Sequence, residues 1–491
     1  MHSTYLAAMK TFSPVLIVLG VVLCVSATLQ LFPALVGLAF ETGNHNAFFK
    51  SAATGFLAGT VCVATGHLTR SPHLQPRQMF LITATAWIVV PLFGALPFLL
   101  LPQGFSMADA VFESVSGMTT TGSTVLVGLD NMGQDILLWR SLLHWFGGIG
   151  IIGMAIAVLP FLSVGGMKLF RTESSDWSDK SLPRTQQLLK QMVLVYMAFT
   201  VLCGCLYRVF GMDTLNAVNH AMSTISTGGF STSDSSFAQF ESPVLHWICI
   251  MFMILGASPF ALYLRAFKHR TLAPLGDKQV LGMLAIMAGL TAALAVVVRQ
   301  LGDSSLLDSV TLAAFNLVSV VTTTGFASAD YSQWGNFAIV IFFFATFVGG
   351  CSGSTSGGVK IFRLQLCMTL IREQVARAIH PRAAMPRAYN GAIVSDEIVT
   401  SLVSFLFMMV ICLAVMTLLL SMTGLDLVTS LTGSATALAN VGPGLGPIIG
   451  PAGNFSSLSD MAKWVLCGGM IMGRLEFLTI IVLFSPAFWR R

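Results

Sequence analysis

The sequence predicts an all-α, polytopic membrane protein, and three observations support this fold class. Of its 491 residues, 55% are hydrophobic and only 10% are charged, whereas soluble globular domains carry roughly 25% charged residues. Apolar runs of roughly 18 residues or more, long enough to cross a bilayer, recur along the whole chain. Basic and acidic segments alternate between these runs. Together these features predict a chain that lies largely within a membrane.

The apolar runs begin near the N-terminus and are expected to form helices. Only helices or closed barrels satisfy the backbone hydrogen bonds in lipid, and these runs are longer and more continuous than barrel strands. The first run, 14–40, is too long for the apolar core of a signal peptide, which has about 7–15 residues, so we interpret it as a retained first helix. The expected apolar helices are 14–40, 80–101, 136–162, 190–210, 281–298, 337–349 and 398–422.

The charge pattern between the runs predicts the orientation of the chain. Lys and Arg gather at both termini and in four internal loops, and acidic residues lie in the segments between them. Because cytoplasmic loops carry an excess of Lys and Arg, we expect the basic loops and both termini to be cytoplasmic. The formal net charge of +5 then reflects topology and not nucleic-acid binding. The basic loops are 70–77, 168–190, 265–278 and 360–387.

The cysteines and histidines of the sequence do not indicate a disulfide framework, a metal site or an active site. All nine cysteines lie within or beside apolar stretches, and Cys203 and Cys205 form one Cys-Gly-Cys without a second pair. Neither a disulfide framework nor a zinc site is indicated. The sequence also has no cluster of His, Asp or Cys at one membrane face, as a membrane enzyme would need. We therefore expect no cofactor in this chain and no enzyme activity.

One short pattern occurs four times, each time between two long apolar segments. Each copy ends in Gly and is too short and too polar to cross the bilayer itself. Small residues often mediate helix packing in membranes, which accounts for the glycines of 147–150. Packing does not account for four Gly-terminated loops in the same position. The four copies are 109–122, 216–229, 312–325 and 429–442.

The repeated unit is interpreted as an outer helix, a short re-entrant pore helix with its loop, and an inner helix. Four parallel helix–pore-loop–helix repeats around one pore, preceded by two N-terminal transmembrane helices, give ten crossings. All four loops then fall on the acidic, extracytoplasmic side. The predicted divisions are 1–75 for the first two helices and 76–175, 176–272, 273–385 and 386–491 for the pore repeats.

The four loops have the composition of an ion filter. A cation that enters a membrane without its water shell needs oxygen ligands, and K⁺ filters supply rings of backbone carbonyls from four loops. Glycine permits the backbone conformations that turn carbonyls inward. One such loop would mean little, but four in register predict a selectivity filter for K⁺. The predicted filter residues are Thr120, Thr121, Gly122, Thr227, Gly228, Gly229, Thr323, Thr324, Gly325, Asn440, Val441 and Gly442.

These motifs resemble those of the TrkH/Ktr/HKT superfamily of potassium transporters, and most closely its bacterial TrkH type. The resemblance runs over essentially the whole chain. The segments that carry it are Met118-Thr-Thr-Thr-Gly-Ser123, Ser223-Thr-Ile-Ser-Thr-Gly-Gly-Phe-Ser-Thr232, Val321-Thr-Thr-Thr-Gly-Phe-Ala327, Asn440-Val-Gly-Pro-Gly-Leu-Gly446, His144-Trp-Phe-Gly-Gly-Ile-Gly150, Gly349-Gly-Cys-Ser-Gly-Ser-Thr-Ser-Gly-Gly-Val-Lys360 and Met472-Gly-Arg-Leu-Glu476.

The resemblance implies how the protein assembles and where it works. It implies a homodimer with one pore per subunit in the inner membrane of a bacterium. It also implies a cytoplasmic, TrkA-type regulatory ring that binds nucleotides and gates the pore. The fourth loop departs from the Thr-Thr-Gly pattern of the superfamily at Asn440 and Val441.

A glycine-rich stretch, 349–358, is expected to interrupt the third inner helix. It contains five Gly and four Ser or Thr, and each Gly costs a helix about 1 kcal/mol relative to Ala. A phosphate-binding loop is excluded because Gly358 is followed by Val359 and Lys360. We predict a movable intramembrane loop below the filter, with a static helix break as the alternative. The residues assigned to it are Gly349, Gly350, Gly353, Gly357 and Gly358.

Arg474 is the second predicted gating residue. It lies within the apolar segment 464–484, far from either end of the expected fourth inner helix. A charge at that depth should face water or a partner rather than lipid, and pores use a fixed Arg to oppose cations. We therefore expect an electrostatic barrier in the permeation path. A structural ion pair with another helix or subunit is the alternative.

Potassium uptake through a channel-like pore is the function we predict, and a symporter coupled to H⁺ or Na⁺ is the alternative. Alternating access would call for inverted repeats and a relay of membrane acids. Here the repeats share one orientation, and Glu476 is the only acid deep inside a predicted crossing. Glu113, His220 and Asn316 share one register and are predicted to support the pore helices; for Glu113, attraction of cations is the other interpretation.

Overall fold

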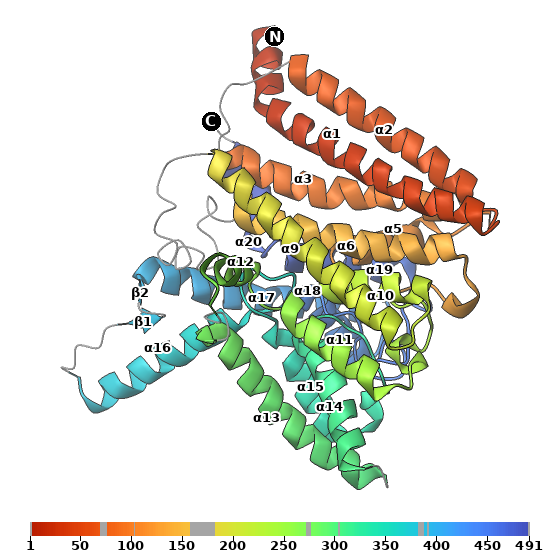
Figure 1. The fold of residues 1–491 in the computed structure, drawn as a ribbon. Coiled ribbons are helices and arrows are strands. Elements are labelled where there is room, and N and C mark those ends of the chain that lie inside the picture. The colour runs from red at the N-terminus through yellow and green to blue at the C-terminus, as the bar shows by residue number, and fades with distance from the viewer. Residues whose placement is uncertain are drawn as a thin grey trace.

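The computed structural model describes residues 2–68, 76–102, 104–157, 182–271, 276–302, 305–381, 387–389 and 392–489. Within these ranges the chain is predominantly helical, with almost no strand (Figure 1). The strands there are β1 (Ala388–Tyr389) and β2 (Ala392–Ile393), which pair antiparallel. The predicted all-α membrane fold is therefore confirmed.

The first two helices form a hairpin at the periphery of the bundle (Figure 1). α1 (His2–Ala39) and α2 (His45–Leu68) cross closely at Gly20 and Gly59. A Cβ on either glycine would lie under 3.0 Å from the carbonyl oxygen of the other. Small residues that let helix backbones approach are typical of membrane helix pairs.

Each of the four repeats contains an outer helix, a pore helix and an inner helix or inner helix pair. The pore helices have 12 to 16 residues, fewer than the roughly 20 needed to span a bilayer. The outer helices are α3 (Pro76–Gly94), α9 (Leu182–Val209), α13 (Lys278–Leu301) and α17 (Asp396–Ser421). The pore helices are α5 (Met107–Met118), α10 (Thr214–Ile225), α14 (Leu306–Val321) and α18 (Leu427–Ala439).

The inner helices vary more from repeat to repeat, and short helices connect some of the elements. The inner elements are α6 (Gln134–Ala157), α11 (Pro243–Gly256) with α12 (Phe260–His269), α15 (Asn336–Val348) with α16 (Ile361–Ile379), and α19 (Asp460–Arg474) with α20 (Leu478–Phe484) and α21 (Pro486–Trp489). The short connectors are α4 (Leu96–Leu99), η1 (Leu129–Asn131), η3 (Ser236–Gln239) and η5 (Tyr331–Gln333).

All four pore helices begin with the same kind of cap. The side chain of Ser106, Asp213, Ser305 or Asp426 accepts a hydrogen bond from a backbone amide in the first turn. Ser and Asp are favoured there because they satisfy amides that have no partner within the helix. The common cap fixes the start of each pore helix, and the Gly-terminated loop follows its end.

Seven described helices are long and apolar enough to cross a membrane, or eight if α11 and α12 count as one span. The prediction of ten crossings exceeds this number because three inner helices are interrupted. α11 and α12 meet at an angle of 90°, the glycine-rich stretch separates α15 from α16, and α19 ends before α20. Ten crossings stays a prediction that treats each interrupted inner helix as one crossing.

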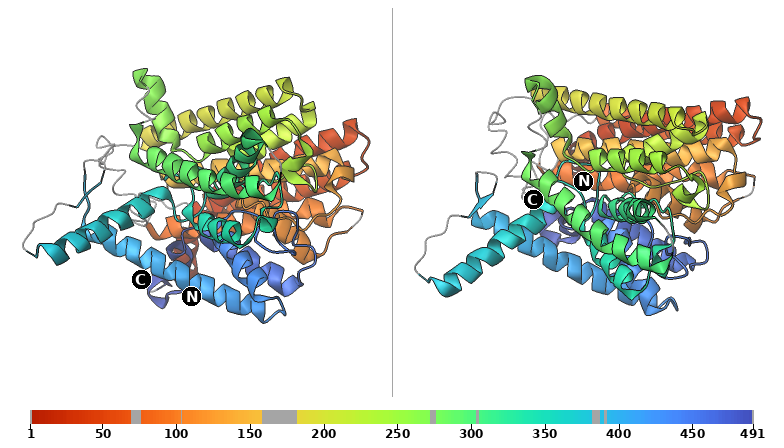
Figure 2. Two further views of the ribbon diagram at one scale, coloured as in Figure 1. Left: turned by 90° about the horizontal axis from the view of Figure 1, so that it is seen from below. Right: turned by 60° about the horizontal axis from the view of Figure 1, so that its bottom comes forward.

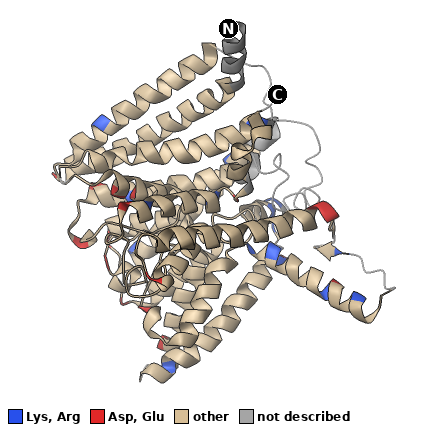
Figure 3. Ribbon diagram, turned by 180° about the vertical axis from the view of Figure 1, so that it is seen from behind, with Lys and Arg blue, Asp and Glu red and all other residues tan. Residues whose placement is uncertain are grey.

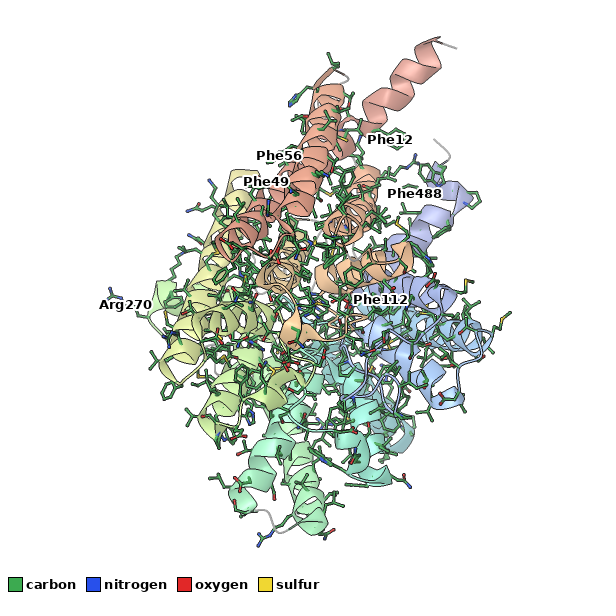
Figure 4. All side chains as sticks on the ribbon, turned by 90° about the vertical axis from the view of Figure 1, so that its right-hand side faces the viewer. Phe12, Phe49, Phe56, Phe112, Arg270 and Phe488 are labelled. Atoms are coloured by element: carbon green, nitrogen blue, oxygen red, sulfur yellow. The ribbon has the colours of Figure 1, made fainter. Side chains whose placement is uncertain are left out.

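The repeats surround the centre of the bundle in chain order. In Figure 4 the ribbon colours pass from orange through yellow-green and cyan-green to blue around the middle of the molecule. Phe112 of α5 lies in the interior, with its ring centroid 5.5 Å from that of Phe455, whereas Arg270 lies at the outer edge (Figure 4). α16 projects beyond the bundle at one end (Figure 2).

Charged residues separate toward the two ends of the bundle. Lys and Arg positions gather along α16, and most Asp and Glu positions lie at the opposite end (Figure 3). This is the separation that the alternating charge pattern predicts. The predicted domain boundaries at 75/76, 175/176, 272/273 and 385/386, and parts of the basic loops, fall on or beside residues outside the described ranges.

Candidate functional site

The four predicted filter loops share one backbone conformation. Their first residues, Thr120, Thr227, Thr323 and Asn440, have φ between 50° and 57°, although a positive φ is uncommon outside glycine. The middle residue of each loop does not have positive φ, and the closing glycine does. This alternation of sign turns successive carbonyls toward the same side of the strand. The closing glycines are Gly122 (φ +89°), Gly229 (φ +79°), Gly325 (φ +86°) and Gly442 (φ +113°).

The four loops close a ring in chain order. At each closing glycine, an added Cβ would lie under 3.0 Å from a backbone carbonyl oxygen of the next loop, a separation that real Cβ atoms essentially never show. Each of these carbonyls belongs to the residue just before the next closing glycine. The contacts run from Gly122 to Gly228, from Gly229 to Thr324, from Gly325 to Val441, and from Gly442 back to Thr121.

Side chains tie the fourth loop to the first. Asn440 Nδ2 donates to Thr121 Oγ1 at 3.0 Å and to the carbonyl of Met470 at 2.9 Å. Ser123 Oγ donates to the carbonyl of Gly442 at 2.7 Å. The departure from Thr-Thr-Gly in the fourth loop therefore introduces an amide that spans the gap between first and last repeats. In the first and third loops, threonine hydroxyls bond within the loop: Thr119 to Thr121 (2.7 Å) and Thr322 to Thr324 (2.8 Å).

Three pore helices brace their own loops from the shared register of Glu113, His220 and Asn316. Each side chain hydrogen-bonds to the chain just beyond the closing glycine. The fourth repeat has Gly433 at this register and uses the neighbouring Thr432, whose Oγ1 accepts from the amide of Leu445 at 3.1 Å. The three pairs are Glu113 with Thr124 (3.0 Å), His220 with Ser231 (3.1 Å) and Asn316 with Ser328 (2.9 Å).

The glycine-rich stretch 349–358 interrupts the third inner helix, in agreement with the sequence prediction. No helix lies between the end of α15 and the start of α16. A Cβ on Gly350 or Gly357 would lie under 3.0 Å from a backbone oxygen of a neighbouring segment. Three other glycines have positive φ: Gly349 (+72°), Gly353 (+78°) and Gly358 (+73°).

This stretch, named here the intramembrane loop, lies against the filter loops of three repeats. The amide of Gly357 donates to Thr323 Oγ1 at 2.7 Å, and the amide of Gly358 donates to the carbonyl of Ala439 at 2.9 Å. The third contact joins two hydroxyls, those of Thr227 and Thr355, at 3.2 Å. The intramembrane loop is therefore positioned directly at the base of the ring.

Arg474 is buried and directed at the intramembrane loop. Its Nη2 donates to the carbonyl of Thr355 at 2.5 Å, and it lines a cavity together with residues of that loop. No carboxylate of the described residues lies within 4.0 Å of its guanidinium. The expectation that Arg474 lies far from a helix end is wrong, because α19 ends there and Glu476 and Phe477 have φ of 57° and 39°.

Two ion pairs, one near the filter loops and one near Arg474, were not predicted from the sequence. Arg363 Nη2 lies 2.6 Å from Glu476, which is therefore not a partner of Arg474. Arg140 Nε lies 2.7 Å from Glu113, whose side chain is fully buried. This pairing favours the supporting role of Glu113 over the attraction of cations. The sequence could have indicated that Arg140 is paired, because a charge within an apolar helix needs a partner or water.

A helical membrane bundle in which four re-entrant loops meet around one ring has the architecture of a membrane transport protein. The sequence matches the model of the TrkH family, described as cation transport protein, over residues 45–491. The chain belongs to this family.

Individual relatives match over nearly their whole length. The Trk system potassium uptake protein TrkI of Halomonas elongata is 47% identical over 485 residues, covering 98% of both chains. The Trk system potassium uptake protein TrkH of Escherichia coli is 33% identical and covers 96% of this chain and 98% of its own. The crystal structure of the potassium transporter TrkH from Vibrio parahaemolyticus superposes with a TM-score of 0.90 at 33% identity, covering 98% of this chain and 100% of that one.

Proposed function

We propose that this chain takes up K⁺ across the bacterial inner membrane through a channel-like pore whose filter is the ring of four loops. The observation that carries the proposal is the closed cycle of glycine-to-carbonyl contacts. It brings the carbonyls of Thr121, Gly228, Thr324 and Val441 from equivalent positions to one place. Rings of backbone carbonyls replace the water shell of K⁺ in filters. The relatives named for potassium uptake support the same cargo.

Selectivity for K⁺ over Na⁺ rests on glycine at all four closing positions. Each of these glycines has positive φ, and none has space for a side chain. Any other residue would push a neighbouring strand outward or turn its carbonyl away. The selectivity filter thus comprises the twelve loop residues predicted from the sequence, with K⁺ as the transported ion and no cofactor in the chain.

The intramembrane loop and Arg474 are the proposed gate. They meet at the base of the ring, where the guanidinium binds the carbonyl of Thr355. A positive charge at this point opposes a cation that leaves the filter. Opening the pore then requires that this contact breaks and that the loop moves aside.

We propose a homodimer with one pore per subunit, regulated by a cytoplasmic, TrkA-type nucleotide-binding ring. Support comes from α16, which projects from the bundle (Figure 2). One of its faces exposes four apolar side chains at helical spacing, as a contact surface would. With the basic loops inside, both termini are cytoplasmic. The exposed side chains are Met368, Ile371, Val375 and Ile379.

A symporter coupled to H⁺ or Na⁺ is less well supported. A proton relay needs an acid that can change its protonation or its partner. Glu476, the acid that lies deepest in the fourth inner segment, is held by Arg363 at 2.6 Å. The channel-like mechanism therefore accounts better for the arrangement of charges.

Reversal potentials separate the two mechanisms. The full chain would be purified, reconstituted in liposomes, and measured under separate K⁺, Na⁺ and H⁺ gradients. For a channel-like pore we expect the reversal potential to follow the K⁺ gradient alone. A reversal potential that shifts with the H⁺ or Na⁺ gradient at fixed K⁺ would establish coupling and contradict the proposal.

A further inference from the structure

One buried arginine, Arg140 of α6, contacts equivalent points of two neighbouring filter strands. Its Nη2 donates to Thr124 Oγ1 at 3.2 Å, and its Nη1 donates to the carbonyl of Ser231 at 2.7 Å. Thr124 follows Gly122 at the same spacing as Ser231 follows Gly229. Because a guanidinium is planar and rigid, this contact fixes the separation of the first and second strands beyond the ring.

Glu113 neutralises this arginine and extends the same network. It pairs with Arg140 Nε at 2.7 Å, and the two side chains are 0% and 1% exposed. The carboxylate also accepts from Thr124 Oγ1 at 3.0 Å and from the amide of Val125 at 3.0 Å. An unpaired arginine this close to the strands would oppose cations, whereas the pair adds no net charge.

The second strand is held by the same face of α6. The Cζ atom of Arg140 lies 4.1 Å from the ring centroid of Phe230, which follows Gly229. His144, one turn further along α6, stacks on Phe230 at a centroid distance of 4.0 Å and accepts from its amide at 3.4 Å. Arg140 and His144 thus fix the side chain and the backbone of the same residue.

Among the three repeats that have an equivalent inner-helix glycine, only the first has this arginine. Gly147, Gly256 and Gly473 occupy equivalent points of three inner helices, because each packs against the last carbonyls of its own pore helix. At the same spacing before these three glycines, the residues are Arg140, Cys249 and Leu466, respectively. The contact is therefore not a general feature of the repeat but a tie between repeats one and two.

We propose that Arg140 is a positioning residue for selectivity: with Glu113 as its counter-ion, it holds the first and second filter strands at the separation that K⁺ requires. This inference rests on the proposed function. It concerns strand geometry and not contact with the ion, so conservative changes should alter discrimination between cations before they alter assembly.

Arg140→Lys and Glu113→Gln test the proposal in the full chain, reconstituted in liposomes. Lysine keeps the charge beside Glu113, but a single ammonium cannot hold Thr124 and Ser231 as a planar fork does. We expect the K⁺/Na⁺ permeability ratio of both variants to fall by about tenfold. Elution volume and melting temperature would report whether the variants assemble.

Lys463→Gln is the matched control. Lys463 is nearly buried and pairs with Asp109 at 2.6 Å at the start of the first pore helix, yet it contacts no filter strand. Breaking this ion pair removes a comparable structural contact. We expect the permeability ratio of this variant to match that of the parent.

The outcomes separate the two proposals. A parent protein without K⁺ preference would overturn the proposed function itself. A selective parent, with folded Arg140→Lys and Glu113→Gln variants that keep its ratio, would overturn the role of Arg140 alone. If single variants fail to assemble because one charge is left unpaired, the double variant Glu113→Gln, Arg140→Met removes both charges and is judged by the same ratio.

Discussion

The filter loops and the intramembrane loop have similar compositions but are held in different ways. Both are rich in Gly, Ser and Thr, non-helical and buried. Each filter loop continues from a capped pore helix and closes against the next loop in the ring. The intramembrane loop has no pore helix before it and contacts the second, third and fourth repeats through separate hydrogen bonds. Similar compositions therefore occur in two segments that are held by different kinds of contact.

Glycine also has different roles in the two regions. At Gly122 the backbone has φ +89° and no space remains beside it, so both conformation and contact require glycine. At Gly353 the backbone has φ +78°, but the nearest atom to an added Cβ is 4.0 Å away. The ring depends on close contact, whereas this part of the intramembrane loop depends on backbone conformation alone.

The largest effect is expected for Gly122→Ser. The new side chain would clash with the carbonyl of Gly228 and narrow the ring. We expect loss of most of the K⁺/Na⁺ discrimination, measured as the permeability ratio in liposomes. Gly128→Ser is the control, because Gly128 also has positive φ (+77°) but nothing within 4 Å of an added Cβ. An unchanged ratio in folded Gly122→Ser would show that the ring is not the filter.

Deletion of residues 350–357 should have the next largest effect. Without this segment the base of the ring is no longer covered, so basal K⁺ flux should rise by about tenfold or more and respond less to any cytoplasmic partner. Flux assays with and without a cytoplasmic extract would measure both effects. A folded deletion variant that conducts and responds like the parent would mean that the segment is a static helix break.

Arg474→Ala should raise K⁺ flux by a smaller factor. Removal of the charge eliminates an electrostatic barrier but leaves the intramembrane loop in place. Arg474→Lys keeps the charge and should conduct like the parent. Purified variants would be checked by size exclusion before uptake is measured. Folded Arg474→Ala protein with flux at or below that of the parent contradicts the barrier, and poor assembly would favour the structural alternative.

The smallest effect on basal K⁺ flux is expected for Gly357→Ala in the intramembrane loop, with Gly353→Ala as its control. Gly357→Ala places a methyl group against the carbonyl of Ala439 and should displace the loop from the ring. Gly353→Ala adds only the backbone strain of a positive φ, about 1 kcal/mol. We expect Gly357→Ala to raise basal flux and Gly353→Ala to leave it nearly unchanged. Equal flux in both variants would show that close packing of this loop does not control the pore.

Local features of the molecule could be predicted well from the sequence. The four Gly-terminated loops could be predicted because one pattern recurs in register, and the helix break at 349–358 because a run with five glycines does not sustain a helix. The end of α19 was missed because Leu475, Glu476 and Phe477 carry no Gly or Pro to mark a break. The bend between α11 and α12 is marked by Pro259, but a continuous inner helix was expected there.

Contacts between repeats could not be predicted, because they join residues far apart in the chain. Arg140 and Ser231 are separated by 91 positions, and Asn440 and Thr121 by 319. The repeated pattern predicts that the loops of Asn440 and Thr121 meet around one pore, but which side chains pair depends on how the four repeats pack. The sequence can indicate that Arg140 needs a partner in the membrane, but not which residue supplies it.

The position of a bound cation would show whether the ring of four loops is the filter. Crystals or frozen grids of the full chain in Tl⁺ or Rb⁺ would reveal the ion by its scattering. We expect density between the carbonyl oxygens of Thr121, Gly228, Thr324 and Val441, and its loss in Gly122→Ser. Density elsewhere in the molecule, with none at the ring, would show that the four loops are not the K⁺ filter.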